Sequence, residues 1–209
     1  MQVSIVDYDM GNVWSVLSAC RHLGVQATLV NDPDKIYHAD CLILPGVGSF
    51  RKAMETLRIK GIDQAIIDTV NRRGINILGI CLGMQLLGSM GTEDGKTAGL
   101  NLVPNRIEKF TLLELENLKI PHVGFNSVEI TEYEGIFKGL PNKPDFYFVH
   151  SYRMLSESMD ANTASCTYGI EFLAAFESEN VCGTQFHPEK SQTNGLRLLN
   201  NFFGSAKVC

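Results

Sequence analysis

The stretch Asn76-Ile77-Leu78-Gly79-Ile80-Cys81-Leu82-Gly83-Met84-Gln85-Leu86-Leu87 decides the fold. Its first half is a short apolar run that predicts a buried strand, and a helical pattern begins after Cys81. Glycines two residues before and two residues after this cysteine relieve crowding where a residue is held in a strained strand-to-helix turn. We therefore expect Cys81 to be a nucleophile whose side chain is exposed at the edge of a sheet. The alternative is a buried cysteine whose neighbouring glycines serve only close packing.

Two sources of peptide N–H donors are expected beside this cysteine. The helix that follows it has free N–H groups and a positive dipole end, which favour a thiolate and a developing oxyanion. The N–H of Leu82, directly after the nucleophile, is expected to be one donor. Pro45-Gly46-Val47-Gly48 follows another apolar run and can turn the N–H of Val47 or Gly48 toward a substrate oxygen. By itself, this glycine loop is more typical of an ordinary turn.

The order of apolar runs and helical patterns predicts an α/β fold. In the first half of the chain, short strands alternate with helices, as in βαβ units with a parallel sheet. The strands expected there are 3–6, 27–30, 41–44 and 75–80. The second half predicts mixed or antiparallel strands over 103–110, 122–130, 146–152, 171–176 and 181–186, and then a helix over 195–203. We expect a single domain over residues 1–209, with an open, mixed, mostly parallel sheet flanked by helices and an added antiparallel region.

Composition and charge argue against several classes of protein. The chain has 209 residues and a net charge of −5, so it presents no basic field for nucleic acid or an anionic membrane. A strand pattern starts at once without a basic leader, and no apolar run is long enough to cross a bilayer. The six cysteines include no C-x-x-C pair, and no His or Cys pair has the spacing of metal ligands. We expect a cytoplasmic protein with reduced thiols and with no metal or other cofactor.

A third polar group follows the last predicted strand. Residues 184–191 contain His187 and Glu189, and residues two apart in an extended segment project to the same side. Glu189 can therefore hold the ring of His187 and fix its tautomer. A cysteine hydrolase needs a nucleophile, a base and a group that orients the base. The alternative is a surface histidine beside a glutamate, and we expect the remaining histidines to be mainly structural or on the surface: His22, His38, His122 and His150.

Three motifs become specific when they are taken together and in order. Pro45-Gly46-Val47-Gly48, Gly79-Ile80-Cys81-Leu82-Gly83-Met84-Gln85 and Phe186-His187-Pro188-Glu189 resemble those of the class I (triad) glutamine amidotransferases, which have a flavodoxin-like fold. Within that family, the chain is most similar to the glutaminase subunits of imidazole glycerol phosphate synthase. The resemblance runs the whole length of the chain and includes residues 7–12, 121–124, 146–152 and 190–192.

The resemblance implies a reaction. Cys81 would attack the side-chain amide carbonyl of L-glutamine. His187, oriented by Glu189, would give a proton to the departing ammonia. Water would then hydrolyse the γ-glutamyl thioester and release glutamate.

It also implies which residues hold the substrate. The N–H groups of Leu82 and of Val47 or Gly48 would bind the oxyanion, and in the resting family enzyme the glycine loop is turned the wrong way. The oxyanion site would then form only when the partner binds its own substrate. The residues implied to bind the ends of the glutamine backbone are Gly48, Gln85, Ser151 and Tyr152.

A partner is implied as well. In the family, ammonia passes across a sealed interface to a (β/α)₈-barrel cyclase subunit, and the heterodimer makes imidazole glycerol phosphate and AICAR in histidine biosynthesis. The residues implied to lie at that interface are Asn12, Phe125, Tyr147 and Lys190. Phe125 is a departure, because the family usually has tryptophan there. Loss of an indole from a contact can weaken binding or adapt it to another barrel.

Three other functions are compatible with these residues. A paralogous glutaminase supplies ammonia for acetamidino-sugar synthesis in surface-polysaccharide pathways, and the sequence does not separate it from the histidine-pathway subunit. A stand-alone cysteine γ-glutamyl hydrolase shares the turn and the triad but acts without a partner. A non-catalytic subunit that only activates a partner is disfavoured because the triad is intact: Cys81, His187 and Glu189.

Overall fold

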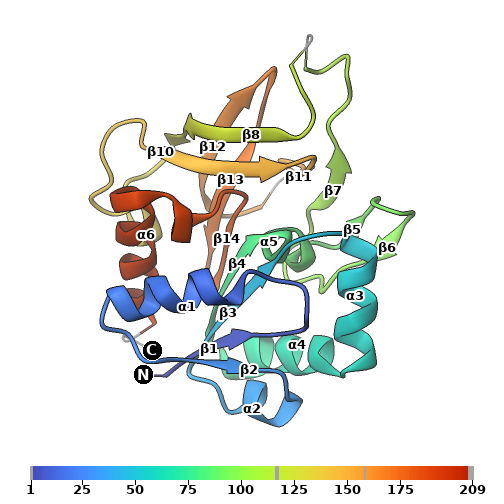
Figure 1. Cartoon of the computed structure of the whole chain (residues 1–209), viewed down its shortest axis with the longest axis vertical. Helices are drawn as coiled ribbons and strands as arrows, with labels where there is room; N and C mark the ends of the chain where they lie inside the picture. The colour runs from blue at the N-terminus through green and yellow to red at the C-terminus, as the bar shows by residue number, and fades with distance from the viewer. Residues whose placement is uncertain (1, 116–117, 158, 207–209) are drawn as a thin grey trace.

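The computed structural model describes residues 2–115, 118–157 and 159–206, which Figure 1 shows as a coloured ribbon. The α-helices are α1 (Val13–His22), α2 (Pro33–Tyr37), α3 (Phe50–Ile59), α4 (Ile62–Arg73), α5 (Leu82–Leu87) and α6 (Gln192–Ser205), and the 3₁₀-helices are η1 (Gly135–Phe137) and η2 (Pro188–Lys190). The strands are β1 (Val3–Val6), β2 (Ala27–Val30), β3 (Cys41–Gly46), β4 (Asn76–Cys81), β5 (Met90–Gly91), β6 (Thr97–Ala98), β7 (Arg106–Lys109), β8 (His122–Ser127), β9 (Glu129–Ile130), β10 (Asp145–His150), β11 (Tyr152–Met154), β12 (Asn162–Tyr168), β13 (Ile170–Ser178) and β14 (Val181–Thr184). Within these ranges, no helix has the length and apolar character that crossing a bilayer requires.

The main sheet has the strand order β2-β1-β3-β4-β14-β13-β12-β9. Neighbouring strands are parallel from β2 to β14. They are antiparallel from β14 to β9. This is the predicted mixed sheet with an antiparallel extension, so the predicted fold class is confirmed.

The carboxyl ends of β3, β4 and β14 meet at one edge of this sheet. Gly46, which ends β3, pairs with Cys81, which ends β4, and Thr184 of β14 pairs with Ile80. Ligands of open α/β sheets bind beyond this edge. Strand pairing therefore brings together three segments that are far apart in the sequence.

Helices cover both faces of the sheet, as Figure 1 shows for α1 and α6 and for α3 and α4. Along β4, Leu78 and Ile80 belong to the core that includes α1 and α6, whereas Ile77 belongs to the core that includes α3 and α4. Side chains of a strand alternate between its faces, and here both faces are buried. The central strands are therefore continuous apolar runs, which is why the sequence identifies them readily.

Two small sheets accompany the main one. One pairs β8 with β10, which Figure 1 shows at the upper end of the molecule, and the other has the order β11-β7-β5-β6. The predicted single strand over 146–152 is wrong, since Ser151 separates β10 from β11 and these strands join different sheets. This break places the backbone of Ser151 and Tyr152 at a bend in the chain.

The prediction misses several elements, among them β12 and α2. β12 contains mainly small and polar residues, and only its Ala164 and Cys166 are buried, so it lacks an apolar run. It is a strand because β13 and β9 pair with its two sides. α2 is too short to show a helical period, but it has a local signal: the Asp32 side chain accepts from the Asp34 N–H at 2.9 Å, and proline follows it.

Candidate active site

Cys81 lies in a strained turn between β4 and α5. Its φ of 55° is in the left-handed region, which costs a residue other than glycine about 1–3 kcal/mol. A Cβ on Gly83 would lie 1.7 Å from the carbonyl oxygen of Leu44, and a Cβ on Gly79 would lie 2.6 Å from the nitrogen of Met84. The close approach of α5 to β3 and β4 therefore requires both glycines.

The predicted exposure of Cys81 is wrong in degree, because the residue is only 6% exposed. Its sulfur lies 3.9 Å from the carbonyl oxygen of Val149 and 3.7 Å from Nε2 of Gln185, so a backbone carbonyl of β10 and the side chain that follows β14 lie against it. It does, however, line a cavity of about 320 Å³. The same cavity is lined by most of the predicted site residues: Val47, Gly48, Leu82, Gln85, Ser151, Tyr152 and His187.

His187 and Glu189 form a buried pair behind this cavity. Nδ1 of His187 lies 2.8 Å from Oε1 of Glu189, and their side chains are 3% and 1% exposed. The His187 N–H donates to the Tyr147 carbonyl oxygen at 2.8 Å, and the Ser191 hydroxyl donates to the His187 carbonyl oxygen at 2.6 Å. The ring is therefore fixed through its own backbone and through the carboxylate.

The charge state of His187 follows from these neighbours. Burial of the ring opposes protonation, but interactions with Cys81 and Glu189 outweigh it and raise the pKa of His187 to about 10. Near neutral pH the ring is protonated, and Nδ1–H donates to Glu189. Nε2 makes no hydrogen bond of good geometry within the described ranges, although the sulfur is close enough to raise the pKa. This proton is available to a group that enters the cavity.

None of the other described cysteines lines this cavity. They are free and buried, and burial raises the pKa of Cys20 to about 11, raises those of Cys41 and Cys166 to about 12, and raises that of Cys182 as well. Such thiols stay protonated and unreactive. In the part of the chain that the structure describes, no group of three His, Cys, Asp or Glu residues could hold a metal ion.

The glycine loop after β3 does not aim all of its predicted donors at the cavity. The Val47 N–H donates to the Met10 carbonyl oxygen at 3.1 Å. Gly48 has a φ of +100°, which glycine adopts without strain. Val47 can become an oxyanion donor only if its peptide turns over and the bond to Met10 breaks.

A chain of amides lies beside the cysteine. Nε2 of Gln85 donates to the Tyr152 carbonyl oxygen at 3.0 Å and to Oε1 of Gln185 at 2.9 Å. Gln185 is fully buried. It directly precedes the His-containing motif, but its type and position alone gave no reason to select it.

Glu93 also lines the cavity, and the sequence analysis does not identify it. Its Oε2 accepts from the Phe50 N–H at 2.8 Å, and burial raises its pKa above the usual value of a glutamate. It lies in the short loop between β5 and β6, where the sequence shows no periodicity and no motif. The cavity lining thus includes a partly buried carboxylate.

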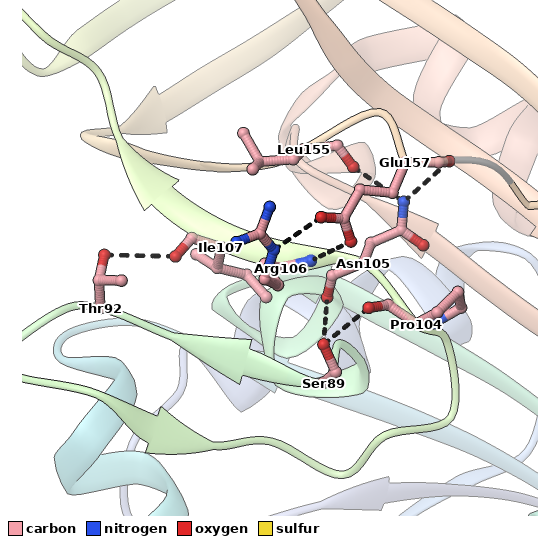
Figure 2. Close-up of polar contacts among 8 residues, drawn as sticks. All are labelled: Ser89, Thr92, Pro104, Asn105, Arg106, Ile107, Leu155 and Glu157. Carbon is pink, nitrogen blue, oxygen red and sulfur yellow. Dashed lines mark hydrogen bonds and ion pairs between the residues drawn. The ribbon is translucent and has the colours of Figure 1, made fainter.

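Polar contacts join the residues on either side of β5 to the segment 104–107, and join that segment to the residues after β11, as Figure 2 shows. They join Ser89 to Pro104 and Asn105, Thr92 to Ile107, Asn105 to Leu155 and Glu157, and Arg106 to Glu157. Thr92 adjoins Glu93, and Leu155 directly follows β11. These contacts therefore tie the residue next to Glu93 and the residue after β11 to the segment 104–107.

The expectation that His122 and His150 are structural needs a correction for His150, which lines the cavity. The Tyr152 carbonyl oxygen, 2.8 Å from Nδ1 of His150, can only accept, so Nδ1 carries the proton. Nε2 of His150 then accepts from Nδ1 of His122 at 3.1 Å. Burial lowers the pKa of His150 to about 3 and that of His122 to about 4, so both rings are neutral.

The residues expected at a partner interface lie at the surface. The Phe125 and Tyr147 rings are 5.6 Å apart, and Nζ of Lys190 lies 5.8 Å from the centroid of the Tyr147 ring. Asn12 is exposed at the start of α1, which packs against η2. Phe125 is 52% exposed, and Trp14 on α1 is 67% exposed.

Comparisons with known proteins identify the family of the chain. The chain matches the family described as "Glutamine amidotransferase class-I" over residues 4–206. It is 44% identical to imidazole glycerol phosphate synthase subunit HisH 1 of Parasynechococcus marenigrum (strain WH8102) over 99% of both chains. It is 42% identical to subunit HisH of Moorella thermoacetica over 96% of this chain and 93% of that one. The crystal structure of a glutamine amidotransferase from Thermotoga maritima shares the fold, with a TM-score of 0.63 at 16% identity over 100% of this chain and 84% of the other. The chain belongs to the class-I glutamine amidotransferase family.

Proposed function

We propose that the chain is a single-domain glutaminase subunit that hydrolyses L-glutamine and passes ammonia to a (β/α)₈-barrel cyclase, which makes imidazole glycerol phosphate and AICAR in histidine biosynthesis. The observation that best supports this is that Cys81 and His187 line one cavity, while the buried carboxylate of Glu189 contacts the His187 ring. The relatives that are named as subunits of imidazole glycerol phosphate synthase support the choice of pathway.

In the proposed reaction, the Cys81 thiolate attacks the amide carbon of glutamine, and the carbonyl oxygen takes the negative charge. His187 gives its Nε2 proton to the leaving nitrogen, which departs as ammonia while the γ-glutamyl thioester forms. A water molecule then adds to the thioester, with His187 now accepting its proton, and glutamate leaves as the thiolate is restored. Glu189 stabilises the protonated ring, since its buried carboxylate accepts from Nδ1–H.

The cavity also offers complementary groups for the rest of the substrate. Glutamine carries an ammonium and a carboxylate at its α-carbon. We assign the ammonium to Glu93, whose carboxylate lines the cavity, and the backbone ends more generally to Gly48, Gln85, Ser151 and Tyr152.

Replacing Glu93 with glutamine is expected to raise KM for glutamine about tenfold or more with a smaller change in kcat, since a charged hydrogen bond contributes about 1.5–3 kcal/mol. The amide oxygen can still accept from the Phe50 N–H, so the loop should stay in place. Steady-state glutaminase kinetics measure this effect. Glu55→Gln on the exposed face of α3 is the matched control. An unchanged KM in the Glu93 variant would place the ammonium elsewhere.

The proposed resting state lacks one oxyanion donor, because Val47 is bonded to Met10. We propose that partner binding turns this peptide toward the cavity. Loss of one oxyanion donor costs about 10²–10³ in kcat. The isolated chain should therefore be a weak glutaminase, and adding the cyclase with its own substrate should raise kcat by about that factor. A chain that is fully active alone would instead be a stand-alone γ-glutamyl hydrolase.

The choice of acceptor is tested by pairing the chain with each candidate barrel. The histidine-pathway cyclase is expected to stimulate glutaminase activity and to use the ammonia. Stimulation only by an amidotransferase barrel of acetamidino-sugar synthesis would overturn the assigned pathway. Phe125 is relevant here, since its exposed ring with Tyr147 and Lys190 forms the proposed contact surface.

A further inference from the structure

Within the part of the chain that the structure describes, Gln185 is the one side chain that touches both the sulfur of Cys81 and the amide of Gln85. It is 0% exposed, and its backbone N–H donates to the Ala174 carbonyl oxygen at 2.7 Å. Water cannot reach this side chain to replace a lost contact. Its amide is therefore held in one place by the sheet.

The orientation of each amide follows from one backbone carbonyl. The Tyr152 carbonyl oxygen can only accept, so the Gln85 atom 3.0 Å away must be its NH₂ group. The same NH₂ group faces Gln185 at 2.9 Å, so the facing atom of Gln185 must be Oε1. The NH₂ group of Gln185 is then left to face the Cys81 sulfur at 3.7 Å. His150 donates to the same Tyr152 oxygen, which reinforces this direction.

We infer that Gln185 is a positioning residue that donates a hydrogen bond to the Cys81 thiolate through its NH₂ group and orients Gln85 through its Oε1. An N–H donor stabilises a thiolate more than a thiol, since charged acceptors form the stronger bonds. The accepting Oε1 leaves the carbonyl oxygen of Gln85 free for the substrate. Only the effect on glutamine turnover rests on the proposed function, because the contact with sulfur exists without substrate.

The contact with sulfur is tested by alkylating Cys81 in the full chain with iodoacetamide across a range of pH, with peptide mass spectrometry to follow this cysteine alone. Gln185→Met removes both polar groups at similar volume. We expect the midpoint of its pH profile to rise by about one unit and the rate at pH 7 to fall about tenfold. Gln64→Met, on the exposed surface of α4, should match wild type.

A second variant keeps the test decisive if Gln185→Met does not fold. Gln185→Glu keeps an acceptor for Gln85 but places a carboxyl group beside the sulfur, so its profile should shift in the same direction. Thermal unfolding checks that each variant is folded. A folded Gln185 variant whose profile superimposes on that of wild type overturns the inference.

Steady-state kinetics with the partner separate positioning from a purely structural role. Gln185→Met should lower kcat about tenfold and also raise KM, since both the thiolate and Gln85 lose a partner. If the Gln185 variants shift the alkylation profile but the wild-type chain releases no ammonia with any partner, the role of Gln185 stands and the proposed function is overturned. If the alkylation profiles of the variants and the wild type superimpose while the wild type has full glutaminase activity, the proposed function stands and the role of Gln185 is overturned.

Discussion

Replacing Cys81 with alanine is expected to abolish ammonia release from glutamine, with kcat falling by at least about 10⁴. The reason is chemical: the thioester cannot form without the sulfur, and the remaining described cysteines are buried with raised pKa values. The reaction of the proposed cyclase partner with added ammonium should keep its rate, because the substitution removes one thiol from the cavity and should leave the fold and the proposed contact surface intact. Both rates are measured on the same purified complex.

A second variant is Cys81→Ser, which nearly keeps the size of the side chain and replaces the thiol with a hydroxyl group. It should lose glutaminase activity as well, because a serine hydroxyl is a much weaker nucleophile beside a protonated imidazole. Loss of the ammonium-dependent reaction in both variants would mean that the proposed division of labour between the subunits is wrong.

The second large effect is expected from Glu189→Gln. The buried carboxylate, 2.8 Å from Nδ1 of His187, stabilises the ring's positive charge. An amide of the same shape supplies no charge and can present its NH₂ group to the ring, which imposes the wrong tautomer. We expect kcat to fall by about 10²–10⁴, as in other triads, while KM changes little.

Glu171→Gln is the matched control, since Glu171 is an exposed glutamate on β13. It should leave glutaminase activity unchanged. If kcat of the Glu189 variant stays close to that of wild type, Glu189 has no part in orienting or charging His187. The pH profile of kcat in the same variant shows whether the ring still holds its proton near neutrality.

The sequence predicts the fold well where strands are buried on both faces. β4 is the clearest case, because all of its residues are buried and a Cβ on Gly79 or Gly83 would collide with neighbouring backbone. β12 could not be predicted, since its small and polar residues form a strand only through pairing with β13 and β9. The break at Ser151 is likewise set by two different sheets and not by the local sequence.

The site divides in a similar way. His187 and Glu189 are two residues apart, so an extended segment suffices to predict their contact. Gln185 and Glu93 contact residues far along the chain, so the local sequence does not predict these contacts. The Val47–Met10 bond depends on how one peptide is turned, which residue types do not determine.

The most direct measurement uses a diazoketone analogue of glutamine, which occupies the glutamine site and alkylates the attacking atom. After incubation of the complex with this analogue, peptide mass spectrometry should find one adduct per chain, on Cys81. Glutaminase activity should be lost at the same rate as the adduct forms, and excess glutamine should slow both. An adduct on any other residue, or inactivation with the Cys81 sulfur unmodified, would contradict the assignment of this sulfur as the group that removes nitrogen from glutamine.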